Sequence, residues 1–425
     1  MTLILLIISI LVLLAFRLPV ALALAVPSAV YVLLGGFSME IAAQRMFAGV
    51  DSFPLLAVPL FMLAGALMNQ GGITERIFEF VESALGHIRG SLGYVNISAS
   101  VVFSGMSGAA VVDAAGLGAI EIKAMKERGY DEKFAVGITA ASSTIGPIIP
   151  PSIPAVVYAV TAGVSLGSLF IAGVLPGLLM ALALAIAVYV YTRFNDVPTS
   201  RRESAAFIWK AFVRALPALM APVIILAGIF AGFFTPTEAG AIAVLYALLV
   251  AAVVYRAITW RQLWTVLLQT AEMTAAIMVI VAASAVFSWV LALEQAPQLL
   301  SAAVLGTTDS PFVFVLLVIV VLLLVGMVLE PLTAILILVP MLQPLVRAYG
   351  LDPVHFGVIT ILALMIGLLT PPVGLVLYVL HSVSGVSIRT AIQGTLPFLI
   401  PLIAALLLIA YVPQISLLLP RYFGF

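Results

Sequence analysis

The chain has 425 residues, of which 64% are hydrophobic and 8% charged, far below the roughly 25% charged residues expected of a soluble domain. Its 18 basic and 18 acidic side chains balance to zero net charge, so nothing indicates a nucleic-acid partner. Cysteine is absent, which excludes disulfides, thiolate metal sites and cysteine nucleophiles. The composition predicts an all-α polytopic membrane protein in a lipid bilayer.

The first part of the chain, residues 1–90, is predicted to form scaffold spans and an arm helix. It begins at Met1 without a basic region or a small-residue cleavage site, so we interpret the first apolar stretch as a retained span and not a signal peptide. Spans are expected at about 1–16, 18–36 and 52–70. Residues 73–89 carry apolar groups on one helical face and charged groups on the other, which is typical of a helix lying at the membrane interface.

Two unusual segments follow, a hairpin and a broken helix. Residues 91–128 are rich in Gly, Ala and Ser and end in charged residues, so they are predicted to form a re-entrant hairpin. Residues 132–163 would be one span, but Gly146 and four prolines interrupt it. Each proline removes a backbone donor and clashes with the carbonyl four residues back. Freed carbonyls at membrane depth are tolerated only where protein or water surrounds them, so the break should line a site.

A span at 166–192 ends the first half, 1–194, and polar residues 195–214 are predicted to form a cytoplasmic linker. The second half, 215–425, repeats the plan: scaffold spans within 215–293, a hairpin at 311–346, a broken helix at 353–384 and a span at 390–412. At a constant offset of 221 residues, Gly146 falls on Gly367 and Pro150-Pro151 falls on Pro371-Pro372. Interrupted segments at corresponding positions of a repeat point to the binding site of a secondary transporter. The alternative is a pair of ordinary proline kinks, but a kink needs only one proline.

The positive charges predict an orientation. If the amino terminus is outside and neither hairpin crosses, all but three of the 18 Lys and Arg side chains fall on the cytoplasmic side, where such charges are favoured; the exceptions are Arg45, Arg347 and Arg421. Each half then makes five crossings, so the halves are inverted repeats and both termini are periplasmic. The two hairpins enter from opposite sides, and their tips should meet the broken helices near the midplane.

The breaks predict two cation sites built from neutral oxygens. In the first, the carbonyls of Gly146, Ile149 and Pro151 lose their helical partners, and Ser107 at the hairpin tip can add a hydroxyl. The repeat places the second site at Gly326, Gly367, Thr370 and Val373. Hard, neutral ligands suit Na⁺, which must also be able to leave. For the hydroxyls of Ser107, Thr144 and Thr370, the alternative is a bond back to the preceding turn.

A carboxylate substrate could bind beside these sites, because the half-helix amino termini after Pro151 and Pro372 point their positive ends there. The candidate contacts are Ser104, Gly108, Asp113, Ser152 and Thr333. Asp113 and Glu330 lie near the hairpin tips, and membrane carboxylates are functional candidates, for example as a proton relay. Capping of backbone donors, or contact with water, is the alternative for both. For Glu238, two residues after a proline, we expect a structural role at a helix start, and for Glu272 a solvated position.

Seven motifs spread over almost the whole chain match a known family: Gly71-Gly72-Ile73-Thr74-Glu75-Arg76, Ser107-Gly108 with Asp113, Gly129-Tyr130-Asp131, Thr144-Ile145-Gly146-Pro147-Ile148-Ile149-Pro150-Pro151-Ser152, Thr235-Pro236-Thr237-Glu238-Ala239, Asp352-Pro353-Val354-His355-Phe356-Gly357 and Thr370-Pro371-Pro372-Val373-Gly374. At these motifs the sequence resembles the large membrane subunit of tripartite ATP-independent periplasmic (TRAP) transporters, within the ion-transporter superfamily. The sequence departs from the family pattern at Ala109, where a second serine is common, and at Ala363 and Val376, where asparagines are common.

The resemblance implies an elevator-type, Na⁺-driven importer in the bacterial inner membrane, with sodium ligands at the eight positions named above. It also implies two partners, a small four-helix membrane subunit on a separate chain and a soluble periplasmic substrate-binding protein. The expected function is therefore sodium-coupled import of an organic acid that the binding protein delivers, without enzymatic activity.

Three other functions remain open. One is a self-sufficient Na⁺/dicarboxylate symporter, which would need no binding protein. An intramembrane enzyme is disfavoured because no His and carboxylate occur at metal-ligand spacing and no pair of nucleophile and base is evident. A passive channel fits inverted broken helices less well than alternating access does.

Overall fold

The structure is a computed structural model that describes residues 2–16, 18–199 and 202–425, without the side chains of Thr2, Leu11, Ala15 and Ser107. The described residues form helices and no strand. The first half contains α1 (Thr2–Ala15), α2 (Val20–Leu34), α3 (Met39–Val50), η1 (Phe53–Leu56), α4 (Ala57–Gln70), α5 (Ile73–Leu85), α6 (Ser91–Ser107), α7 (Ala110–Ala115), α8 (Leu117–Glu127), α9 (Glu132–Ser143), α10 (Ile153–Ala162) and α11 (Leu166–Phe194).

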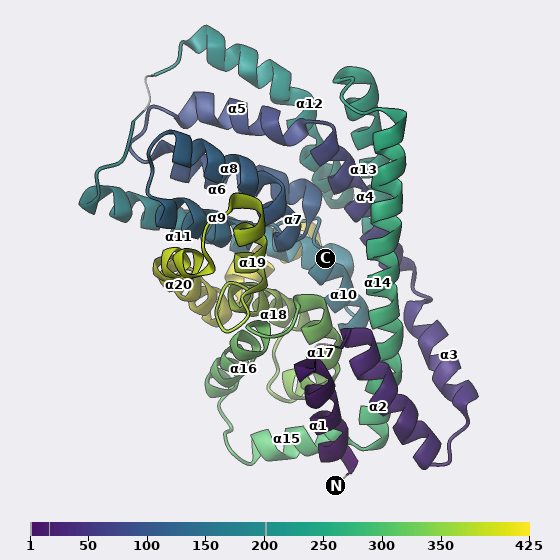
Figure 1. Cartoon of the computed structure of the whole chain (residues 1–425). Helices are drawn as coiled ribbons and strands as arrows, with labels where there is room; N and C mark the ends of the chain where they lie inside the picture. Colours follow the sequence, from purple (N-terminus) through teal and green to yellow (C-terminus); the bar gives the residue numbers. More distant parts are fainter. Residues whose placement is uncertain (1, 17, 200–201) are drawn as a thin grey trace.

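The second half repeats the order of hairpin, broken helix and long helix (Figure 1). Its elements are α12 (Ala205–Phe230), α13 (Pro236–Leu249), η2 (Val250–Val254), α14 (Trp260–Leu293), α15 (Ala296–Leu305), α16 (Pro311–Gly326), α17 (Pro331–Ala348), α18 (Pro353–Gly367), α19 (Leu375–Ser384), α20 (Ile388–Tyr411) and α21 (Gln414–Phe423). Both hairpins and both broken helices therefore lie within a few residues of the predicted bounds.

Seven helices in the described part are long and apolar enough to cross a membrane: Phe53–Gln70, α11, α12, Pro236–Val254, α14, α17 and α20. The protein is thus a polytopic α-helical membrane protein. Helices α1 and α2, which lie in two of the predicted spans, have only 14 and 15 residues. At a rise of about 1.5 Å per residue, such helices are shorter than the hydrocarbon core of a bilayer, which is about 30 Å thick.

Some helix bounds differ from the sequence expectation, and capping explains two of the differences. Helix α12 begins at Ala205, inside the segment assigned to the linker, because the Ser204 hydroxyl accepts from Phe207 N at 3.2 Å. Helix α14 begins at Trp260, eight residues before the span expected at about 268–293, at a capping box formed by Thr259 and Gln262. Helices α3, α15 and α21 were not expected at all. Each has only 10 to 12 residues, too few to stand out in the sequence as an apolar span.

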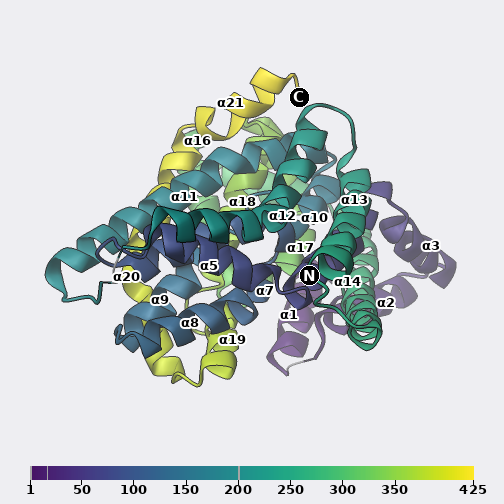
Figure 2. The same cartoon turned by 90° about the horizontal axis from the view of Figure 1, so that it is seen from above.

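The helices form two groups that lie on opposite sides of the molecule in both views (Figures 1 and 2). In the scaffold group, α14 packs against α2, α3 and α4, and α4 packs against α13. The hairpin group contains both hairpins and both broken helices, α6–α10 and α16–α19, together with α20, which packs along α9. Helices α5 and α12 lie side by side along one edge (Figure 1).

Glycines allow the broken helices to touch the long helices backbone to backbone. A Cβ on Gly394 in α20 would lie 2.1 Å from Lys133 O in α9, and one on Gly137 would lie 2.0 Å from Gly394 O. The repeat pairs Gly394 with Gly173 in α11, where a Cβ would lie 2.2 Å from Ile148 O in the first break. Small residues at such crossings let membrane helices approach closely.

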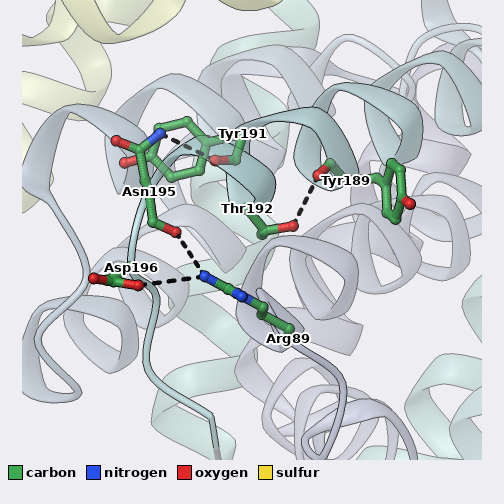
Figure 3. A network of polar contacts seen from close by, with 6 residues as sticks. All are labelled: Arg89, Tyr189, Tyr191, Thr192, Asn195 and Asp196. Atoms are coloured by element: carbon green, nitrogen blue, oxygen red, sulfur yellow. Dashed lines mark hydrogen bonds and ion pairs between the residues drawn. The ribbon is translucent and has the colours of Figure 1, made fainter.

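A polar network at the end of α11 attaches the linker to the loop between α5 and α6 (Figure 3). The Arg89 guanidinium lies 3.4 Å from both Asn195 O and Asp196 Oδ1, and Asn195 Nδ2 donates to Tyr191 O at 3.0 Å. The two charged side chains are well exposed, so their ion pair contributes little to stability.

Candidate functional site

The tip of the first hairpin lies directly on the first break. Gly108, between α6 and α7, has a φ of 63°, a conformation that favours glycine. Its carbonyl accepts a hydrogen bond from Ile153 N at 3.3 Å, and a Cβ here would lie 2.5 Å from Pro151 O. Both its conformation and the close approach therefore require glycine, and the expected meeting of hairpin tip and break is confirmed.

The second hairpin meets the second break in the same way. Val373 N donates to Met327 O at 3.3 Å, joining the loop between α18 and α19 to the end of α16. Helices α16 and α18 cross at two glycines, because a Cβ on Gly367 would lie 2.8 Å from the Cα of Gly326. The two halves thus build equivalent contacts from equivalent elements.

Asp113 on α7 occupies the space beside the first break. Its side chain is 1% exposed, and a Cβ on Gly146 would lie 2.2 Å from its Oδ2 atom. Glycine at position 146 therefore makes room for this carboxylate. The sequence analysis placed both residues at the site but did not predict that they touch.

Three carbonyls of the first break accept no backbone hydrogen bond in the described part of the chain: those of Gly146, Ile149 and Pro151. These are the carbonyls expected to ligate Na⁺ at the first site. The side chain of the fourth expected ligand, Ser107, lies outside the described residues. The Thr144 hydroxyl donates to Ala141 O at 2.6 Å, so it bonds back to the preceding turn, as the alternative interpretation had it.

At the second break, the carbonyls of Gly326, Thr370 and Val373 also accept no backbone hydrogen bond from the described residues. Gly367 O accepts from Thr370 N at 2.8 Å and so closes a turn. The Thr370 hydroxyl donates to Ile366 O at 3.0 Å, the bond back to the preceding turn. A hydroxyl that donates one bond keeps its lone pairs, so it can still ligate a cation.

A cavity of about 490 Å³ separates the two hairpin tips from the scaffold group. Its hairpin-group wall includes residues 109–112, Pro147, Glu330 and Met365. Ile153 and Leu375, the first residues of the half-helices α10 and α19, line the same space. Its volume is in the range of small-molecule sites in proteins, about 300–1,000 Å³. The arrangement can hold a small solute between two groups of helices.

The scaffold wall of this cavity carries polar side chains that the sequence analysis missed. They are Asn69 and Gln70 at the end of α4, and Gln269 and Thr270 in α14. A signal was available for the first pair, because Asn69 and Gln70 end an otherwise apolar helix, whereas α14 carries several other polar residues. The sequence does not show, however, that these two helices face the hairpin tips, since the repeat relates the halves to each other and not the scaffold to the hairpins.

All five candidate substrate contacts lie outside the lining of the cavity formed by the described residues: Ser104, Gly108, Asp113, Ser152 and Thr333. Ser104 Oγ donates to Val101 O at 2.6 Å. Ser152 caps α10, because its Oγ accepts from Ala155 N at 3.1 Å and also donates to Pro147 O. Thr333 is completely buried, and its hydroxyl has no hydrogen-bond partner among the described residues. Gly108 directly precedes the lining residues 109–112.

Glu238 and Glu272 were expected to have a structural role and a solvated position. Glu238 forms a capping box with Thr235 at the start of α13, with Thr235 N donating to its Oε2 at 2.8 Å. Glu272 is exposed on α14. The prediction for Glu238 is confirmed, that for Glu272 stays a prediction, and neither residue lines the cavity.

Comparison with known proteins identifies the family. The family described as "Tripartite ATP-independent periplasmic transporter, DctM component" matches residues 7–415. The chain is 47% identical over 392 residues to the sialic acid TRAP transporter large permease protein SiaM of Vibrio cholerae, covering 92% of both chains. It is 39% identical over 388 residues to the C4-dicarboxylate TRAP transporter large permease protein DctM of Pseudomonas aeruginosa, covering 91% of both.

Two further comparisons extend this picture. The chain is 38% identical over 405 residues to the 2,3-diketo-L-gulonate TRAP transporter large permease protein YiaN of Escherichia coli, covering 95% of both. Among solved structures, the YdaH transporter of Alcanivorax borkumensis has a similar fold, with a TM-score of 0.65 at 15% sequence identity and 88% coverage of both chains. The hairpins that meet broken helices, the repeat and these matches lead to one conclusion: the chain belongs to the large-permease family of TRAP transporters.

Proposed function

We propose that this chain imports an organic acid by a sodium-coupled elevator mechanism, in which the hairpin group moves past the scaffold group. The observation that carries the proposal is the contact of each hairpin tip with one break, at Gly108 and Ile153 and at Met327 and Val373. These contacts place unbonded carbonyls and a cavity at the boundary between the two groups of helices. A solute bound in the cavity could move with the hairpin group while the scaffold group stays in place.

Sodium coupling is supported by the chemistry of the breaks. Each break exposes several carbonyl oxygens without a backbone donor, and an unpaired carbonyl at membrane depth costs several kcal/mol. A small cation of hard character offsets that cost. We assign one Na⁺ to Ser107, Gly146, Ile149 and Pro151 and a second to Gly326, Gly367, Thr370 and Val373.

The solute is proposed to be a carboxylate. The relatives are named for sialic acid, 2,3-diketo-L-gulonate and C4-dicarboxylates. Each half-helix start that lines the cavity carries partial positive charge. We further propose that a small four-helix membrane subunit and a periplasmic binding protein complete the transporter, and that both termini of this chain face the periplasm.

The function is tested by uptake of a panel of carboxylates into proteoliposomes that contain the reconstituted complex, with and without a sodium gradient. The proposal predicts uptake that depends on the sodium gradient and on the binding protein. Equal uptake without the binding protein would favour the self-sufficient symporter instead. Uptake that ignores the sodium gradient would contradict the assignment of the two cation sites.

Replacing Thr370 by alanine is expected to raise the sodium concentration for half-maximal uptake about fivefold, because one oxygen ligand worth about 1 kcal/mol is lost. Sodium titration of uptake measures the change. Thr395→Ala is the matched control, because Thr395 Oγ1 makes the same bond back to its preceding turn, at 2.9 Å from Ala391 O. If both variants respond to sodium like the unmodified protein, the Thr370 hydroxyl is not a ligand.

Replacing Met273 by tryptophan is expected to reduce uptake at least tenfold, because the larger side chain would fill the cavity from the scaffold side. The effect should be a loss of solute binding, which calorimetry of the complex can measure, with the sodium sites intact. Val279→Trp on the same helix is the control, because Val279 is 53% exposed and lies outside the cavity lining. Normal uptake by the Met273 variant would place the solute elsewhere.

A further inference from the structure

Glu121 is a carboxylate that the proposed mechanism does not use, although it is buried inside the first hairpin. It lies in α8 with 1% of its surface exposed. Helix α8 packs against α6, α7, α9 and α19, so Glu121 is enclosed by the hairpin group. It lies outside the lining of the cavity, and it is not among the residues assigned to sodium.

Three neutral polar side chains from two other helices gather around this carboxylate. Asn96 in α6 donates through Nδ2 to Glu121 Oε2 at 2.6 Å and to Thr139 Oγ1 in α9 at 2.7 Å. Ser142 in α9 donates to Asn96 Oδ1 at 2.5 Å. All four side chains are buried, and Glu121 Oε1 has no hydrogen-bond partner among the described residues. The cluster therefore satisfies only one of the two carboxylate oxygens.

An ionised carboxylate is costly at this position. No Lys, Arg or His side chain of the described chain lies within 4.0 Å of Glu121 to compensate its charge. A buried charge without a counter-charge costs several kcal/mol even after relaxation. Asp113 on α7, itself buried, is close enough to interact electrostatically with Glu121, so ionising both groups would add repulsion.

The other charged or titratable groups on the surrounding helices do not relieve this cost. Lys126 in α8 pairs with Glu132 in α9 at 2.6 Å, at the exposed base of the hairpin. His381 in α19 directs Nδ1 at Val386 O, 2.7 Å away. The remaining such groups on these helices are Tyr94, Lys123, Glu127, Lys133 and Tyr378, and none of them is fully buried.

We propose that Glu121 is a proton-binding site of the hairpin group, neutral in the conformation described here, and that it takes up and releases one proton in each transport cycle. Protonation transfers H⁺ from a hydronium ion of the adjoining solution to the carboxylate and leaves a water molecule. A proton fits better than a metal ion, because Asn96 points its positively polarised amide group at Glu121 and only one carboxylate oxygen is left to ligate. Intramembrane carboxylates commonly act as proton carriers. Release of the proton during transport rests on the proposed function, whereas its binding does not.

Infrared spectroscopy of the purified chain in lipid tests the binding. At neutral pH the unmodified protein should show the C=O band of a protonated carboxyl group, and Glu121→Gln should lose part of that band. Glu127→Gln is the matched control, because Glu127 is exposed on the same helix. An unchanged band in Glu121→Gln would overturn the proposal, whether or not the protein transports anything.

Proton release is tested with the full complex in weakly buffered proteoliposomes that contain a pH-sensitive dye. With a fixed sodium gradient, solute uptake by the unmodified complex should move protons, and Glu121→Gln should take up solute without them. The amide keeps an acceptor for Asn96, so the variant should fold, and a second variant, Glu121→Ala, separates loss of the proton from loss of packing. Equal proton movement in the Glu121→Gln and unmodified complexes would overturn the coupling. Failure of all solute uptake in the unmodified complex would instead contradict the proposed function.

Discussion

Replacing Gly146 by valine is expected to abolish uptake. Even the first side-chain atom, Cβ, would lie 2.2 Å from Asp113 Oδ2, well inside van der Waals contact. The carboxylate would have to leave its buried position, or the first hairpin would have to separate from the first break. Either change disturbs the carbonyls assigned to the first sodium ion. Sodium-driven uptake by the reconstituted complex, with the folded fraction checked by size-exclusion chromatography, measures the effect.

The control for Gly146 is Gly163→Ala at the C-terminal end of α10. Gly163 has a φ of 67° but no heavy atom within 4 Å of a Cβ, so alanine costs only about 1 kcal/mol of backbone strain. This variant should keep its uptake. A second comparison separates the clash with Asp113 from other effects of a side chain at position 146. Combining Gly146→Ala with Asp113→Ala removes that clash. Normal uptake by the Gly146 valine variant would show that Asp113 does not fill this space.

Replacing Gly394 by alanine is expected to destabilise the protein by about 3 kcal/mol, because the crossing of α9 and α20 has no room for a side chain. The new Cβ would lie 2.1 Å from Lys133 O, and backbone atoms cannot move aside as a flexible side chain can. The two helices would separate along their whole contact. A large drop in Tm of the purified protein is therefore expected, together with loss of uptake.

Gly385→Ala, in the loop before α20, is the control for this variant. Gly385 has a φ of 70° and no neighbour within 4 Å of a Cβ, so its substitution should cost about 1 kcal/mol through strain alone. Equal losses of Tm in the two variants would mean that the close packing of α9 on α20 adds no stability. The comparison separates the cost of the lost packing from the cost of backbone strain when glycine is replaced.

The architecture of the hairpin group could be predicted because its signals are local. Gly146 and the adjacent prolines fix the first break through steric rules that act within a few residues, and the repeat transfers the result to Gly367. Helix starts set by caps, such as that of α12 at Ser204, are also local, but they lay in polar sequence that was assigned to the linker. A cap in polar sequence does not show by itself whether a helix follows it.

The candidate site could be predicted only in part, because the rest depends on contacts between distant segments. The cavity gets its scaffold wall from α4 and α14, about 200 residues apart, and no spacing rule links Asn69 with Gln269. Hydroxyls were also hard to assign. Thr144, Ser152 and Thr370 all bond to carbonyls of the same segment, a use that depends on side-chain orientation and not on residue type.

The cavity shared by the scaffold and hairpin groups has a consequence for how tightly a solute is held. Its amides come from α4 and α14, whereas the half-helix starts and the carboxylate of Glu330 belong to the hairpin group. In the proposed stroke a bound solute travels with one set of partners and loses the other. The affinity of the protein for the solute must therefore fall as the hairpin group moves. Release of the solute then follows from this movement and requires no separate gate beside Asn69, Gln70 and Gln269.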